Sequence, residues 1–510
     1  MRQRLQYAFF GILSALVGIA AGHLVAAFLN PASSPVLAIG STVIDLTPTP
    51  VKEWAVAQFG TADKPILVGS VSAGALLLAA VGGVLARRRF ALGALVIVAL
   101  VALTGLAAVL RPTAGPLDAV PALATALAGV VALWWLTTAA AASTQTSSAE
   151  YAEAEPEGTA SRRGVLIAAG ALAAAAAVMG GVGRWVTSLR TDPSEVALPA
   201  TTDPAGSFPQ GLEGKVDGIS PFQTPNADFY RIDTRLSLPT VDIDSWTLTV
   251  DGDVDQQVTL TFDELTQMDN IERDITLTCV SNDVGGPYVG GARWLGVKLT
   301  DVLDRAGVGS DSDQILCTDV DGMTISVPLK VATDGRDAML AFGMNGEALP
   351  VEHGFPVRMV VPGLYGFVSA CKWITRMTLT TYDAQQAYWT ERDWAIDAPI
   401  KISSRIDTPK SFAEIEAGDT FIGGVAWSQG EGVDKVEVKI DGGDWQEAKL
   451  GPSAGVDYWR QWYHPWKAES GQHTLTVRAT NGQGEVQSPA KAMPFPNGSS
   501  GYQSIITRVS

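Results

Sequence analysis

The chain has 510 residues, a formal net charge of −17 and three cysteines, Cys279, Cys317 and Cys371. Its length allows about three domains, and its acidity excludes the basic surface that nucleic-acid binding requires. Three cysteines at long spacings form neither a disulfide framework nor a Cys-x-x-Cys redox or metal motif.

Charge and apolar residues are divided unevenly along the chain. Residues 190–510 hold 25 Lys and Arg against 45 Asp and Glu, whereas nearly all long apolar runs precede residue 186. Five of these runs are long enough to cross about 30 Å of hydrocarbon. They cover residues 8–29, 66–86, 90–110, 119–141 and 165–186. The sequence therefore predicts a membrane-embedded helical region of about five spans over residues 1–186.

Arginines predict the orientation of this region. Arg2, the run Arg87-Arg88-Arg89 and the pair Arg162-Arg163 fall on the same side of five spans. By the positive-inside rule that side is cytoplasmic. We therefore expect a multi-pass cell-membrane protein whose remaining residues lie on the extracytoplasmic side.

The pair Arg162-Arg163 also precedes an alanine-rich apolar run and follows an acidic linker at 143–160. This arrangement resembles an internal twin-arginine export signal, and an ordinary cytoplasmic anchor pair explains it equally well. The twin-arginine route carries folded proteins, which suits a domain that must fold before export.

Residues 187–220 form a linker rich in Pro, Gly, Thr and Asp, after which short strands and short helices alternate. Residues 246–250 alternate Trp, Leu and Val with Thr, the pattern of a half-buried strand. Thr261-Phe-Asp-Glu264 is a capping box that opens a short helix. We predict an α+β domain over residues 221–405.

From about residue 408 the pattern consists of strands alone. Residues 435–440 alternate charged and β-branched side chains and meet a turn at Asp441-Gly-Gly443. Residues 471–480 repeat the alternation. We predict an immunoglobulin-like β-sandwich over residues 406–510.

One cysteine ends a predicted strand at a glycine-rich loop. Thr276-Leu-Thr-Cys-Val-Ser-Asn282 places Cys279 at the strand end, and Asp283-Val-Gly-Gly-Pro-Tyr follows. A thiol in this position suits a reactive thiolate or a soft metal ligand. A lone buried cysteine is more often a small apolar core residue, so Cys279 taken alone leaves both interpretations open.

Six short blocks occur in one order between residues 224 and 366. They are Thr224-Pro-Asn-Ala-Asp-Phe-Tyr-Arg231, Trp246-Thr-Leu-Thr-Val-Asp-Gly252, Leu277-Thr-Cys-Val-Ser-Asn282, Ala292-Arg-Trp-Leu-Gly-Val297, Met344-Asn-Gly-Glu-Ala-Leu-Pro-Val-Glu-His-Gly-Phe-Pro-Val-Arg358 and Val361-Pro-Gly-Leu-Tyr-Gly366. In this order they resemble the sulfite oxidase family of molybdopterin enzymes over about residues 220–400. The β-rich C-terminal part resembles the family's immunoglobulin-like dimerisation domain, which implies a homodimer.

The resemblance implies that Cys279 is the thiolate ligand of molybdenum, with the pterin dithiolene completing the coordination, and that Asn282 belongs to the same catalytic loop. A soft thiolate suits a metal that cycles between oxidation states. The positions that match the family's phosphate contacts are His353, Arg358, Ser369 and Lys372.

Other positions mark the far edge of the expected cofactor site. Tyr230 and Arg231 match pterin contacts in the periplasmic methionine-sulfoxide reductase branch of the superfamily. Asp233 and Thr234 occupy the positions at which sulfite oxidases carry Asn and His, and we expect Asp233 to contact the cofactor. Asp319 or Asp321 is expected either to reach the cofactor or to be a solvated loop carboxylate.

The substrate side departs from the family pattern. Asn282 is followed by Asp283 where sulfite oxidases carry anion-binding arginines, and Trp394 stands where they carry a tyrosine. A carboxylate near an anion site repels the anion. Trp394 is expected to be a substrate wall or an aromatic core residue.

The resemblance predicts a molybdenum oxidoreductase that performs two-electron oxygen-atom transfer on a small-molecule substrate. Reduction of a sulfoxide or N-oxide on the same fold is an alternative, and a non-catalytic membrane receptor that retains the fold is another. No Cys-x-x-Cys-His motif is present, the cysteines are too few for a cluster, and only His23 lies in a span. We therefore expect no haem or iron–sulfur cluster in this chain and a separate electron-transfer partner.

Overall fold

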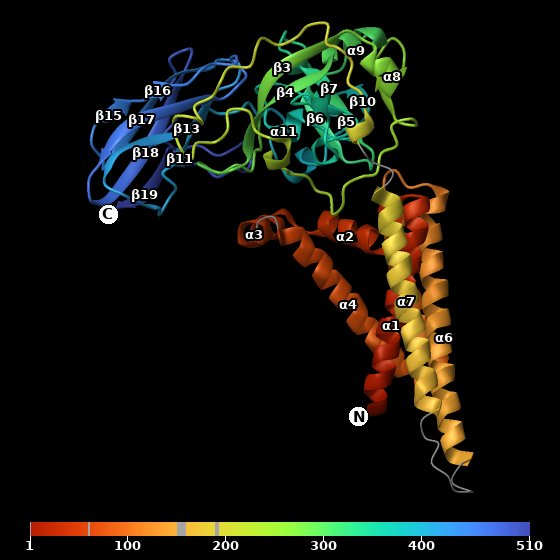
Figure 1. Ribbon diagram of the computed structural model, residues 1–510. Helices are drawn as coiled ribbons and strands as arrows, with labels where there is room; N and C mark the ends of the chain where they lie inside the picture. Colours follow the sequence, from red (N-terminus) through yellow and green to blue (C-terminus); the bar gives the residue numbers. More distant parts are fainter. Residues whose placement is uncertain (1, 60–61, 150–159, 189–192) are drawn as a thin grey trace. The chain divides into compact units, whose positions relative to one another are not determined.

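A computed structural model describes residues 2–59, 62–149, 160–188 and 193–510 (Figure 1). The chain divides into two compact units. The helical unit contains Met1–Asp192 and Asp233–Thr240, and the β-rich unit contains Pro193–Ile232 and Val241–Ser510.

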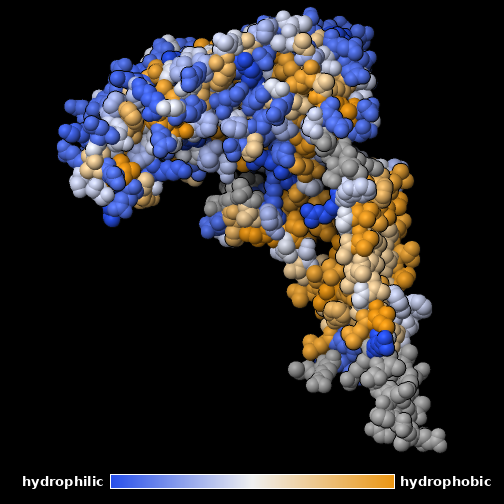
Figure 2. Space-filling view, in the orientation of Figure 1, coloured by the Kyte–Doolittle hydropathy of each residue, from blue (hydrophilic) through white to orange (hydrophobic). Residues whose placement is uncertain are grey.

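The helical unit is built from long apolar helices. Its helices are α1 (Arg2–Phe28), α2 (Pro35–Leu46), α3 (Thr49–Phe59), α4 (Asp63–Ala86), α5 (Phe90–Val109), α6 (Val120–Ala149) and α7 (Ala160–Ser188). Each of the five predicted spans forms a helix that is long and apolar enough to cross a membrane, and α2 is a shorter apolar helix between the first two. Apolar side chains cover the outside of these helices in Figure 2.

Small residues allow the helices to approach closely. Helix α1 packs against α4, α6 and α7. A Cβ atom added at Gly83 of α4 would lie 2.0 Å from the carbonyl oxygen of Tyr7 in α1. The two backbones therefore meet at a glycine, as is common between helices in membranes. The side chain of Arg162, in the expected export signal, lies outside the described residues.

Two sheets, one mixed and one antiparallel, form the first part of the β-rich unit. One has the order β2-β1-β10-β5-β6 and the other β3-β4-β7-β8, with β9 paired to β7. The strands of the first sheet are β1 (Thr247–Gly252), β2 (Val258–Thr261), β5 (Gln314–Asp319), β6 (Thr324–Pro328) and β10 (Ile374–Thr380). Those of the second are β3 (Asn270–Thr278), β4 (Val289–Lys298), β7 (Met339–Met344), β8 (Glu347–Ala348) and β9 (Arg358–Val360).

Four short helices accompany these sheets: α8 (Phe262–Thr266), α9 (Leu299–Ala306), α10 (Leu329–Ala332) and α11 (Gly366–Ser369). The predicted capping box is confirmed, because Glu264 N donates to Thr261 Oγ1 at 3.2 Å and Thr261 N donates to the Glu264 carboxylate at 2.8 Å. The predicted half-buried strand is β1, in which Leu248 and Val250 are buried.

Two further sheets share one core at the C-terminal end. Their orders are β11-β13-β17-β16 and β12-β19-β18-β14-β15. The strands are β11 (Ser403–Thr408), β12 (Glu414–Ile415), β13 (Gly418–Trp427), β14 (Val433–Ile440), β15 (Trp445–Glu447), β16 (Lys449–Leu450), β17 (Arg460–Ala468), β18 (Gly471–Asn481) and β19 (Gln503–Val509). The core between them contains Ile422 and Trp462 from one sheet and Val436 and Leu475 from the other. The predicted turn after β14 is confirmed by positive φ angles at Asp441 and Gly442.

Loops of the C-terminal sheets are bonded directly to β3, the strand that precedes Cys279. Trp459 N donates to Thr276 Oγ1 at 2.9 Å, and Thr276 N donates to Asp457 O at 3.0 Å. Gln429 Nε2 donates to Thr276 O at 2.5 Å. Thr276, near the C-terminal end of β3, is therefore held at its backbone N–H, its carbonyl oxygen and its side chain by residues far along the chain.

Candidate active site around Cys279

Cys279 lies at the end of β3, where the chain leaves the sheet for a tight loop. Asn282 N donates to Cys279 O at 3.1 Å, and Asn282 Oδ1 accepts a hydrogen bond from Tyr288 N at 2.8 Å. Cys279 N donates to Tyr288 O at 3.0 Å. Asn282 therefore shapes the loop and fixes the thiol at the strand end.

The thiol is 8% exposed, and burial raises its pKa, although hydrogen bonds from Ser281 and the charge of Lys372 oppose that rise. A buried thiol in this position stays protonated unless a cation or a metal takes the proton's place. The hydroxyl of the preceding Thr278 is buried and has no hydrogen-bond partner within the described ranges.

Arg358, at the start of β9, is a buried cation. Its side chain is 5% exposed, Nη1 donates to His353 O at 3.0 Å, and the guanidinium lies 5.0 Å from the centre of the Trp294 ring. Burial lowers its pKa to about 10. Among the residues that the structure describes, no carboxylate forms an ion pair with it. A buried cation without a counter-charge fits an anionic ligand at this point.

His353 faces the same region from the short turn Val351–His353. Its Nε2 lies 3.0 Å from Asn226 O, and burial lowers its pKa to about 4. Because a carbonyl oxygen only accepts, Nε2 carries the proton and the neutral ring presents Nδ1 as an acceptor. His353 is therefore suited to accept a hydrogen bond from a ligand N–H or O–H.

Lys372 is brought beside His353 and Arg358 by backbone pairing. Met359 N donates to Cys371 O at 2.9 Å, and Ile374 N donates to Val357 O at 3.2 Å. Lys372 Nζ donates to Glu352 O at 3.3 Å. Ser369 lies nearby in α11, and its hydroxyl donates to Leu364 O at 3.0 Å and to Tyr365 O at 3.1 Å, so this side chain is used within its own turn.

Two phenols, the half-buried Tyr230 and the buried Tyr365, flank the thiol. Burial raises the pKa of Tyr230, and a charge on Cys279 raises it further. A Cβ at Gly366 would lie 3.9 Å from the Tyr230 hydroxyl and 3.8 Å from Thr278 O, which places this phenol beside the strand end. Burial also raises the pKa of Tyr365 to about 12, with Cys279 again contributing. Arg231 follows Tyr230 and is half-buried.

Tyr365 had no predicted role, although it stands in the last quoted block. A Cβ at Gly498 would lie 2.5 Å from its hydroxyl, so the backbone of residues 494–500 packs directly on this ring. Lys401 Nζ donates to Gly498 O at 2.6 Å, and Ser499 Oγ donates to Asn282 O at 2.6 Å. The C-terminal segment thus reaches the cysteine loop, a contact that no short motif signals.

Trp394 belongs to an aromatic cluster next to α11. Its ring centre lies 5.5 Å from Phe367, 5.9 Å from Trp389 and 5.2 Å from Phe495. The side chain is 8% exposed, and its Nε1 has no hydrogen-bond partner within the described part of the chain. The indole therefore offers an apolar ring face and an N–H donor that has no partner within the described residues.

Two expected cofactor contacts have other partners. Asp233 belongs to the helical unit, where its carboxylate lies 3.1 Å from Lys64 Nζ. Asp319 Oδ1 accepts hydrogen bonds from Asp321 N at 2.9 Å and Met323 N at 3.0 Å, so its carboxylate holds the turn between β5 and β6. That turn is bonded to the segment that carries Lys372, because Val320 N donates to Trp373 O at 3.0 Å.

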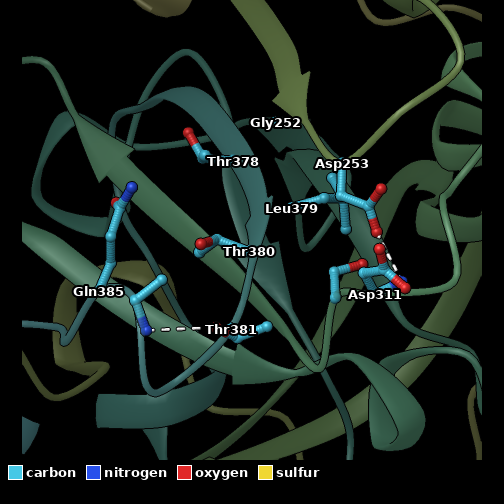
Figure 3. Close-up of a pocket in the computed structure, with 10 residues that line it drawn as sticks. Gly252, Asp253, Asp311, Thr378, Leu379, Thr380, Thr381 and Gln385 are labelled. Atoms are coloured by element: carbon cyan, nitrogen blue, oxygen red, sulfur yellow. Dashed lines mark hydrogen bonds between the residues drawn. The ribbon is translucent and has the colours of Figure 1, made fainter.

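A hollow of about 410 Å³ opens elsewhere, beside the ends of β1 and β10 (Figure 3). It is lined by Gly252, Asp253, Asp311, Ser312, Thr378, Leu379, Thr380, Thr381, Ala384 and Gln385. Asp253 accepts a hydrogen bond from Asp311 N at 2.9 Å within it. None of the predicted site residues lines this hollow.

The described residues contain no group of three or more His, Cys, Asp or Glu side chains that could hold a bare metal ion. The donors around Cys279 fit a metal that arrives within a larger anionic cofactor, because they offer one thiolate and a buried cation without a counter-charge.

Comparisons with known proteins agree with this donor set. Residues 235–389 match the family described as oxidoreductase molybdopterin binding domain. Mitochondrial sulfite oxidase from Mus musculus is 34% identical over 272 residues, which cover 44% of this chain and 49% of the mouse protein. NADH nitrate reductase 1 from Nicotiana tabacum is 29% identical over 277 residues, covering 43% of this chain and 30% of that protein. The chain thus spans about half the length of the mouse protein that it matches.

Among solved structures, the crystal structure of the sulfane dehydrogenase SoxCD from Paracoccus pantotrophus resembles this chain with a TM-score of 0.50 and 22% sequence identity. The match covers 57% of this chain and 84% of that chain. At this identity the match supports the fold alone.

Proposed function

We propose that this chain is a molybdopterin-dependent oxidoreductase of the sulfite oxidase family and that it catalyses two-electron oxygen-atom transfer at a molybdenum bound by Cys279. Two observations carry the proposal. Cys279 is a buried thiol at a strand end, and Arg358 is a buried cation with no carboxylate in an ion pair among the described residues. When bound, the molybdenum cofactor supplies the two-electron redox centre and the site of oxygen transfer.

The residues of the chain hold this cofactor in distinct ways. Cys279 would ligate the metal as a thiolate, held in position by the end of β3. Arg358 and Lys372 would neutralise the pterin phosphate. His353 accepts a hydrogen bond at Nδ1. Tyr230 lies beside the thiol, and its hydroxyl keeps its proton because its pKa is raised. Asn282 holds the loop closed around the metal ligand.

Two substrate classes are candidates. Sulfite oxidation follows from the family, but Asp283 places a carboxylate beside the cysteine loop, which opposes binding of an anion. An uncharged sulfoxide or N-oxide fits the aromatic cluster better. The oxygen of such a substrate would accept a hydrogen bond from the Trp394 indole N–H, which has no partner within the described residues. We expect the reduction of such a substrate to exceed sulfite oxidation.

The helical unit anchors the enzyme in the cell membrane, with the arginine clusters on the cytoplasmic side and the β-rich unit outside. Arg162 and Arg163 form a twin-arginine signal that exports the folded domain. The C-terminal sheets form an immunoglobulin-like sandwich that joins two chains, and electrons pass to or from a separate protein.

Metal analysis tests the proposal. Full-length protein extracted from membranes should contain about one molybdenum and one pterin per chain. Cys279→Ala should abolish turnover of sulfite, sulfoxide and N-oxide while the protein remains folded. The matched control is Cys317→Ala, since Cys317 is also buried but its thiol lies 3.8 Å from the Met359 sulfur in the core of the unit. Folded, membrane-extracted protein without molybdenum would favour a receptor that retains the fold.

A further inference from the structure

A short turn, residues 283–286, lies between the two residues that hold the backbone of Cys279. Cys279 N donates to Tyr288 O at 3.0 Å, and Asn282 N donates to Cys279 O at 3.1 Å. Asn282 and Tyr288 flank the turn, and Tyr288 N donates to Asn282 Oδ1 at 2.8 Å across it. The N–H and the carbonyl group of Cys279 therefore both depend on the residues at the two ends of this turn.

The turn itself has a flexible composition. Gly286 N donates to Asp283 O at 2.8 Å, which closes it, and Gly285 has a φ of +79°. Asp283 is exposed, and both glycines are half-buried. Glycine loses more conformational freedom on ordering than any other residue. The turn therefore needs contacts from other parts of the chain to keep one conformation.

Side chains from the C-terminal part of the β-rich unit hold the carbonyl oxygens on both sides of the turn. Ser499 Oγ donates to Asn282 O at 2.6 Å, directly before the turn. Arg405, in β11, donates from Nη1 to Gly286 O at 3.0 Å, at its end. The peptide groups at which the chain enters and leaves the turn are thus each bonded to a residue more than 100 positions away.

Gln503, at the start of β19, packs against the middle of the turn. A Cβ atom added at Gly285 would lie 2.4 Å from Gln503 Nε2. The amide of Gln503 is held in turn, because Ile406 N donates to its Oε1. The turn therefore lies in direct contact with the C-terminal strands, and a side chain at position 285 would push it away from them.

Arg405 is itself held in a fixed direction. Its Nε lies 2.6 Å from Asp407 Oδ1, and the two side chains are 11% and 8% exposed. Its Nη2 donates to Ser220 Oγ at 2.9 Å, and Ser220 N donates to Asp407 Oδ2 at 3.0 Å. The donors of a guanidinium have a rigid planar geometry. With Nε and Nη2 engaged in this way, Nη1 is directed at Gly286 O.

We propose that Ser499 and Arg405 are positioning residues for Cys279. By holding the carbonyl oxygens on both sides of the 283–286 turn, they keep the thiol at the end of β3 in the place that a metal ligand requires. Gln503 limits movement of the turn between them. The proposal rests on the role proposed above for Cys279, and it assigns residues of the C-terminal sheets and their loops to the active site of the same chain.

Alkylation of the cysteines provides the test. Full-length cofactor-free protein in detergent is treated with iodoacetamide under native conditions, and mass spectrometry follows each of the three thiols. We expect Ser499→Ala and Arg405→Lys to raise the rate at Cys279 by about fivefold or more, because each loses a hydrogen bond that keeps the loop closed. The rates at the buried Cys317 and Cys371 should change by less than about twofold, because the rest of the unit stays folded.

Matched variants separate positioning from general stability. Arg405→Lys keeps a positive charge beside Asp407, and Ser499→Thr keeps the hydroxyl and should restore the slow rate. Ser500→Ala removes an equally short hydrogen bond, 2.6 Å from Oγ to Ala490 O, outside the cysteine loop. Arg478→Lys alters an ion pair with Glu437 in the C-terminal sheets. These two controls should leave the rate at Cys279 unchanged.

The second measurement is molybdenum content of loaded protein after prolonged dialysis. Ser499→Ala and Arg405→Lys should lose molybdenum faster than the two controls. An unchanged alkylation rate at Cys279 in either variant would overturn the proposal, as would an equal rise at all three cysteines or unchanged retention of molybdenum. Alkylation does not require bound cofactor, so wild-type protein that lacks molybdenum would refute the proposed function while the hold on the cysteine loop is still measured.

Discussion

Replacing Arg358 should have opposite effects on the cofactor-free and the cofactor-loaded protein. In the free protein the guanidinium is buried without a counter-charge, and its pKa falls to about 10 from an ordinary value above 12. Each tenfold change in proton affinity corresponds to about 1.4 kcal/mol, so burial costs the cation about 3 kcal/mol. The hydrogen bond to His353 O and the contact with Trp294 return about 1–2 kcal/mol. We expect Arg358→Met to stabilise the free protein by about 1–2 kcal/mol.

In the loaded protein the same substitution would remove the charge-assisted contact that we propose between Arg358 and the pterin phosphate. Such a loss is worth about 2–5 kcal/mol, or a Kd at least about 30-fold weaker. The assay is thermal unfolding of protein made with and without molybdenum cofactor synthesis, together with molybdenum content. Arg305→Met, at an exposed position in α9, is the control and should change neither form by more than a few tenths of a kcal/mol. Destabilisation of the free protein by Arg358→Met would refute the reasoning.

Three further outcomes follow from the structure. Because the folded pKa of His353 is lowered to about 4, stability should be full above about pH 6.5 and fall between pH 6.5 and 4, and His353→Gln should remove part of this loss in acid unfolding curves. Gly83→Leu should prevent the close approach of α1 and α4 and lower the Tm in detergent, whereas Gly74→Leu, which meets open space in the same helix, should not. Thr276→Val should lower the free energy of urea unfolding by about 1–3 kcal/mol, because it leaves a buried Trp459 N–H unpaired.

Features set by neighbouring residues were predictable from the sequence. The capping box at Thr261, the turn at Asp441 and the five long apolar helices each depend on a pattern within a few turns of chain, and each forms as expected. The cysteine at the end of β3 follows from the same kind of signal, since a β-branched run ends there in a glycine-rich loop.

Contacts between distant residues were not predictable in this way. Tyr365 gains its position from Gly498, Lys401 and the segment around them, which lie far along the chain. The pairing of Asp233 with Lys64 joins residues 169 positions apart. The sequence shows an acidic residue after Tyr230-Arg231 but contains no local pattern that reveals which lysine will meet it.

The bonds between β3 and the C-terminal loops also set an order of events during synthesis. Thr276 receives its hydrogen bond from Trp459, which is made 183 residues later. At usual rates of translation that delay is roughly 10 to 40 s. The strand that supports the cysteine loop therefore gains its hydrogen bond from Trp459 only after nearly the whole chain has been synthesised. Insertion of a cofactor into a finished site is then a step that follows translation, and any export of the loaded domain must follow both.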